Sequence, residues 1–124
     1  MAAPNLFAAT TATGKTAYIT PANTSANVLL ANSAASNKVL KINMINVSNV
    51  DGTNAFNATV SLNTTAAGGG TTYQIAATVS VPANASLLVS DKASTFYLEE
   101  DKSILVTSSS ANKLVFTVSY EEIG

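Results

Sequence analysis

The sequence has 124 residues, a mass of 12.6 kDa and a formal net charge of −1 from six lysines and seven acidic residues. It contains no Arg, His, Cys or Trp. These absences exclude zinc sites built on Cys and His, Cys–His nucleophile pairs and bidentate arginine clamps, and the net charge offers no basic surface for nucleic acid.

The length fits one domain with one hydrophobic core, and regularly spaced Val, Leu, Ile and aromatic residues favour a folded chain over a disordered one. The first ten residues lack the basic and apolar regions of a signal peptide, and no apolar stretch is long enough to span a membrane. Without cysteine there is no disulfide framework. We therefore expect a folded domain that contacts neither membranes nor nucleic acid.

Residues 1–14 show no regular alternation and are predicted to form an extended arm, with the folded domain at 15–124. The arm carries isolated apolar side chains at Leu6 and Phe7. It either packs on its own domain or lies on a neighbouring subunit. The second possibility makes Leu6 and Phe7 candidate partner-binding residues.

Apolar and small polar side chains alternate along three long segments, which predicts strands with one buried face. These segments are 56–63, 73–81 and 114–121, and shorter strands are expected at 17–19, 27–30, 86–89, 95–98 and 103–107. In the segment 39–47 the apolar parity changes between Met44 and Ile45. Either a β-bulge lies there or both faces of that strand are buried.

Turn-forming sequences separate these strands. They are the Asp51–Gly52 pair, a flexible hairpin tip at 68–70, a break at 82–84, a charged turn at 99–102 and a polar turn at 108–112. Eight or nine short strands with such spacing predict an all-β fold. We expect a single antiparallel β-sandwich, either jelly-roll-like or immunoglobulin-like.

No residue pattern indicates an enzyme, a metal site or a cofactor. The acidic clusters 99–101 and 121–122 could supply a carboxylate pair for glycoside hydrolysis, but acids at strand ends more often keep turns solvated. The oxygens of 49–54 could bind calcium, although an Asx-type turn explains them better. The glycines at 68–70 lack the Lys and the helix of a phosphate loop.

Most aromatic residues fall on alternating strand positions and are expected in the core, among them Phe56, Tyr73 and Phe116. Phe96 and Tyr97 are adjacent, so one of them must point away from the core. We therefore add Phe96 and Tyr97 to the candidate partner-binding residues.

A series of segments resembles small all-β virion proteins of tailed bacteriophages. These segments are 39–49 (VLKINMINVSN), 56–62 (FNATVSL), 81–89 (VPANASLLV), 97–106 (YLEEDKSILV), 109–114 (SSANKL) and 118–122 (VSYEE). They span roughly 36–124, and their order and spacing carry the resemblance. The family's turn often has Gly before Asp, whereas Glu100 precedes Asp101 here, so this turn is expected to differ in type.

The resemblance implies a virion structural protein made in the cytoplasm of a bacterial host. We expect a decoration (cement) protein on the capsid surface, in contact with the major capsid protein or other virion proteins and forming homo-oligomers such as a trimer. A tail, neck or fibre-base component is the alternative within this class. A carbohydrate-binding β-sandwich is the alternative from another class, although the chain lacks Trp.

Overall fold

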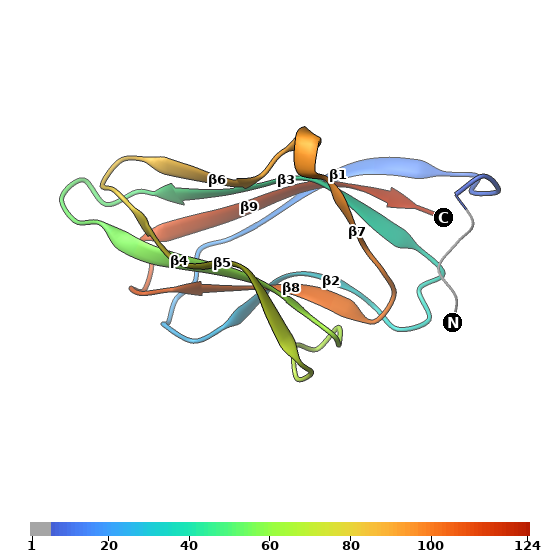
Figure 1. The fold of residues 1–124 in the computed structure, drawn as a ribbon, viewed down its shortest axis with the longest axis horizontal. Coiled ribbons are helices and arrows are strands. Elements are labelled where there is room, and N and C mark those ends of the chain that lie inside the picture. Colours follow the sequence, from blue (N-terminus) through green and yellow to red (C-terminus); the bar gives the residue numbers. More distant parts are fainter. Residues whose placement is uncertain (1–5) are drawn as a thin grey trace.

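The computed structural model describes residues 6–124, which form two antiparallel sheets packed face to face (Figure 1). Sheet A has the order β1 (Ala12–Ile19), β9 (Leu114–Ile123), β3 (Val39–Asn49), β6 (Ser86–Ser90), and β7 (Phe96–Leu98) also pairs with β3. Sheet B has the order β2 (Asn27–Asn32), β8 (Lys102–Ser108), β4 (Phe56–Asn63), β5 (Thr72–Val81). A 3-10 helix, η1 (Lys92–Ser94), links β6 to β7. The prediction of an all-β sandwich with eight or nine strands is confirmed.

The chain connectivity identifies the type of sandwich. The chain changes sheet at almost every connection, and only β4–β5 and β6–β7 follow one another within one sheet. The first and last strands, β1 and β9, are neighbours in sheet A, and β2 and β8 are neighbours in sheet B. This double Greek key is the jelly-roll topology. An immunoglobulin sandwich has its first two strands in one sheet, so the immunoglobulin-like alternative does not apply.

The core lies between the sheets and is built from alternating side chains. On β9, Leu114, Phe116 and Val118 are fully buried, as the sequence predicts. Phe116 is the largest fully buried side chain among the described residues. Ala58 and Val60 of β4 contribute to the same buried cluster from sheet B, and Phe56 is partly buried against it.

The predicted irregularity in β3 is a β-bulge. Ile42 pairs with Tyr120 and Met44 with Ser119, so β3 holds one extra residue against β9. The bulge turns both Ile42 and Ile45 into the core. It lies slightly earlier than the parity change suggests, because Met44 is half-buried and outside the core cluster.

The expectation that Tyr73 lies in the core is wrong. Tyr73 is 62% exposed and Ile75 is 42% exposed, whereas Ala76 packs against the core. The pairing of β4 with β5 shifts register twice, and Thr78 lies in the left-handed region with φ of 50°. Ile75 lies at the second shift and points to the opposite side from Ala76. Tyr73 lies beyond both shifts, paired with Leu62, and is exposed because β5 is the edge strand of sheet B.

The connections also differ in detail from expectation. Strand β1 begins at Ala12, inside the segment assigned to the arm. The loop after β4 is anchored to β8, because the Ser103 hydroxyl donates to the Thr65 carbonyl (2.8 Å) and the Ala66 amide donates to the Asp101 carboxylate (3.1 Å). These side-chain hydrogen bonds hold the base of the hairpin tip at 68–70.

The charged turn at 99–102 differs from the glycine-containing turn of the phage proteins. Asp101 itself takes a positive φ of 56° there without glycine.

Candidate functional site

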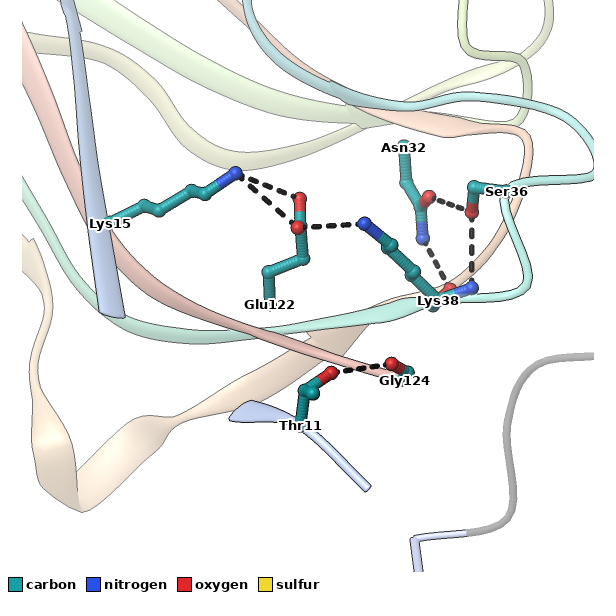
Figure 2. A network of polar contacts seen from close by, with 7 residues as sticks. All are labelled: Thr11, Lys15, Asn32, Ser36, Lys38, Glu122 and Gly124. Atoms are coloured by element: carbon teal, nitrogen blue, oxygen red, sulfur yellow. Dashed lines mark hydrogen bonds and ion pairs between the residues drawn. The ribbon is translucent and has the colours of Figure 1, made fainter. Parts of the chain in front are cut away.

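The base of the N-terminal arm is tied to the end of the chain. The Gly124 amide donates to the Thr11 carbonyl (3.0 Å), and the Thr11 hydroxyl donates to the Gly124 carbonyl oxygen (2.6 Å; Figure 2). From Ala12 onward the arm continues as β1 along β9. These bonds fix where the arm leaves the domain.

The arm and sheet A together enclose an open groove, which we call the arm groove. Its volume is about 430 Å³, and it is lined by Leu6 and residues 9–12 of the arm, by Lys41 and Tyr97, and by Glu121 and Ile123 of β9. Lys41 of β3 and Glu121 of β9 are paired positions of neighbouring strands, and their charged groups lie 3.9 Å apart. The groove therefore brings two predicted contact residues, Leu6 and Tyr97, onto one surface.

The other two predicted contact residues occupy different environments. Phe7 follows Leu6 on the arm, and its side chain is fully exposed. Phe96 packs against the core, whereas Tyr97, next to it on β7, is 49% exposed. This confirms that one of the adjacent pair points away from the core and identifies it as Tyr97.

A second depression lies beside the arm groove, between the edges of the two sheets. We call it the tyrosine pocket. It has a volume of about 240 Å³, and its mostly apolar lining includes Leu62 and Tyr73 from sheet B and Tyr97 and Leu98 from sheet A. Glu99 and Lys102 are its charged lining residues. Tyr97 lines both depressions, so the arm groove and the tyrosine pocket form one continuous surface.

An ion-pair network lies near the C-terminal end of β9. The Glu122 carboxylate contacts Lys38 Nζ at 3.0 Å and Lys15 Nζ at 3.3 Å (Figure 2). The hydrogen bond from Lys38 is the main cause that lowers the pKa of Glu122, and Lys15 adds to it, while desolvation acts in the opposite direction. The network thus joins β1 and Lys38, the residue before β3, to the end of β9.

Replacing this carboxylate tests the network. We expect Glu122→Gln to lower the free energy of unfolding at neutral pH by less than about 1 kcal/mol, because the ions are partly solvated. Since the folded-state pKa is depressed, the stabilisation is present above the unfolded-state pKa and is lost as the pH falls through the folded-state pKa. Urea unfolding from pH 7 to pH 2 should therefore show the difference between wild type and variant shrinking with acid. Glu99→Gln, which changes an exposed carboxylate that forms no ion pair within residues 6–124, is the control.

Comparison with known proteins supports the fold. No protein-family model matches the sequence, and no curated protein matches it either. A chain in the crystal structure of the T13 IBDV viral particle, a structure placed in the evolution of icosahedral viruses, is similar with a TM-score of 0.50. The match covers 90% of this chain at 9% sequence identity and only 31% of that chain. At this identity the similarity shows a common fold.

The acidic clusters do not form a paired carboxylate site. Glu121 and Glu122 are successive residues of β9, and each is bound by lysine. The Asp101 carboxylate accepts from the loop after β4. Both carboxylate oxygens of Glu100 are buried without a hydrogen-bond partner, and Glu99 is exposed. Within residues 6–124 no cluster of acidic side chains is suited to hold a metal ion, and no helix is long and apolar enough to cross a membrane.

The turn around Asp51 is a structural turn. The Asp51 carboxylate accepts hydrogen bonds from the amides of Thr53 (2.7 Å) and Asn54 (3.1 Å), and it contacts Lys113 Nζ at 3.3 Å. These bonds, the one from Thr53 first, lower the pKa of Asp51. Because amides and a lysine already occupy the carboxylate, the Asx-type turn explains these residues better than calcium does.

Three buried asparagines were not recognised in the sequence. Asn32, Asn49 and Asn63 are the last residues of β2, β3 and β4, and each donates its side-chain amide to two acceptors in adjoining loops or strands. Asn49 continues the inward parity of Ile45 and Val47, and Asn32 continues that of Leu30. An asparagine on the buried parity at the end of a strand is the signal that could have identified these two. Asn63 lies on the opposite parity from Ala58 and Val60, so the sequence carries no such signal for it.

Proposed function

We propose that this chain is a structural protein of a tailed-bacteriophage virion that decorates the head shell through protein–protein contacts. The observation that carries the proposal is the jelly-roll sandwich, which is shared with a chain of an icosahedral viral particle and combined with phage-like sequence segments. Its partner in this proposal is the major capsid protein or another virion protein. The proposal includes no enzymatic activity, nucleic-acid binding or membrane contact.

The charge distribution supports a role in packing against other proteins. From Gly52 to Ser90 the sequence carries no charged side chain, and this stretch includes all of β4, β5 and β6. The cores of protein interfaces are depleted of charged residues. A solitary soluble domain usually protects exposed edge strands such as β5 with charged side chains or proline. The uncharged flank is therefore suited to burial in an assembly.

The test compares association with heads and with tails. Purified protein is mixed with heads that lack it and with isolated tails, and bound protein is measured after sedimentation. Quantitative mass spectrometry of intact virions gives its copy number relative to the major capsid protein. Binding to heads and hundreds of copies in a simple ratio are expected. Binding to tails with few copies would replace the proposal with a tail, neck or fibre-base role.

A carbohydrate-binding role is the second candidate, because two exposed tyrosines flank the tyrosine pocket. Aromatic side chains provide flat apolar surfaces with a polar tip, and jelly rolls include lectin domains. Retention on a polysaccharide column that is lost in Tyr73→Ala and kept in Tyr18→Ala would favour this candidate over the head-binding role.

A further inference from the structure

The exposed part of the arm and the tyrosine pocket are complementary in character. Phe7 exposes its whole side chain, and Leu6 is 47% exposed. Residues 6–14 carry no charged side chain, and Lys15 is the first charged residue of the arm region. An uncharged segment with two adjacent large apolar side chains can enter an apolar pocket without leaving an unpaired charge buried.

The surface that would receive such a segment is mostly apolar in the pocket and has paired charges in the adjoining groove. The tyrosine pocket has a mostly apolar lining, with Glu99 and Lys102 as its charged residues. In the adjoining arm groove, Lys41 and Glu121 neutralise one another at 3.9 Å. Tyrosine is among the residues enriched at the centres of protein interfaces, where its large ring contributes contact area and its hydroxyl remains hydrogen-bonded.

The apolar arm and the apolar pocket lie on the same molecule, and this arrangement indicates which partner would bind. Leu6 and Tyr97 line the arm groove, and Tyr97 and Tyr73 line the tyrosine pocket, so the two depressions adjoin at Tyr97. Phe7 is the next residue after Leu6 and projects beside this surface with its side chain exposed. A surface that contains both an apolar projection and an apolar pocket is self-complementary. Two copies related by a two-fold axis make each such contact twice.

We propose that a second copy of this chain docks on this surface, with Phe7 of each copy inserted into the tyrosine pocket of the other. The occupant of the pocket is thus the arm of an identical chain. The interface is symmetric and is centred on Tyr97. It is formed by the protein alone, so the inference stands independently of the proposed attachment to a virion.

Self-association of the full chain provides the first test. Sedimentation velocity over a wide concentration range is expected to show a monomer–dimer equilibrium. Phe7→Ala and Tyr97→Ala should each weaken the dimer by at least about 30-fold, as expected for residues at the centre of an interface. Tyr18→Ala, which removes an exposed tyrosine near the other end of β1, should leave the equilibrium unchanged. A monomer at every concentration, or a dimer unaffected by Phe7→Ala and Tyr97→Ala, would overturn the inference.

Disulfide trapping provides the second test, because the chain has no cysteine of its own. Ala8→Cys protein, in which the thiol follows Phe7, is mixed under mild oxidation with Glu99→Cys protein, in which it lines the tyrosine pocket, and the mixed disulfide dimer is measured by mass spectrometry. Close approach of the two positions should make this pair form faster than Ala8→Cys with Tyr18→Cys. Equal rates for the two mixtures would contradict the proposed seating of Phe7. If the protein binds phage heads but stays monomeric, only the dimer inference is overturned. If it forms the dimer but does not bind heads, only the head-binding role is overturned.

Discussion

Asn49→Asp is expected to destabilise the protein by roughly 3–5 kcal/mol, although the two side chains have nearly the same shape. The Asn49 side chain is 2% exposed, and its amide donates to the carbonyls of Asn54 and Val81, both at 2.9 Å. Its oxygen accepts from the Asp51 amide at 2.9 Å. An aspartate would direct a carboxylate at two carbonyl oxygens, leaving those acceptors unpaired and a charge buried.

The consequence reaches beyond one turn, because Asn49 joins the loop before β4 to the end of β5. Urea unfolding followed by circular dichroism measures the loss. The matched control is Asn57→Asp, the same change at an exposed position of β4, which should alter stability by no more than about 0.5 kcal/mol. Equal effects of the two substitutions would show that the buried amide contributes little.

The strand pattern was readable from the sequence because a strand with one buried face has a period of two. On β9 this period continues without interruption, and Phe116 and Val118 are buried as predicted. The choice between a jelly roll and an immunoglobulin-like sandwich was not readable. Both use short alternating strands, and they differ in which strands pair across the sheets, which the alternation of one strand does not record.

The error at β5 has a physical cause in backbone geometry. A bulge inserts a residue and reverses which side chains face the core beyond it, and the sequence reveals it only where the apolar parity changes with it. In β3 the parity of the apolar residues itself changed, so the irregularity was visible. In β5 the bulges leave Ile75 exposed behind an apparently regular alternation. Tyr73 pairs with Leu62 on the side that faces the core, but it lies on the edge strand of sheet B and is exposed there.

The candidate surface was predicted only in part for a related reason. The adjacency of Phe96 and Tyr97 requires one of them to face outward, which is local information. That Tyr97 meets Tyr73 and Leu6 depends on the packing of β7 beside the edge of sheet B and on the path of the arm. Such contacts join residues far apart in the sequence, and they follow from the topology.

Phe116→Ala is the second substitution with a large expected effect, a loss of about 3–5 kcal/mol in the free energy of unfolding. Phe116 is fully buried at the centre of sheet A, on β9 between β1 and β3. Truncation to alanine removes the ring's apolar contacts and leaves a cavity, because strands paired on both sides cannot close around it. Domains of this kind are stable by only about 5–15 kcal/mol in total, so such a loss is a large share.

Val115→Ala separates this core effect from a general weakening of β9. Val115 is the preceding residue on the same strand, is half-buried and points to the opposite face of sheet A, so it shares the backbone pairing but not the core. Its truncation should cost on the order of 1 kcal/mol or less. Urea unfolding of the three proteins at one pH measures both losses. If the two substitutions destabilised the protein equally, Phe116 would not hold the two sheets together, and the stability of the sandwich would have to come from its strand pairing and buried asparagines.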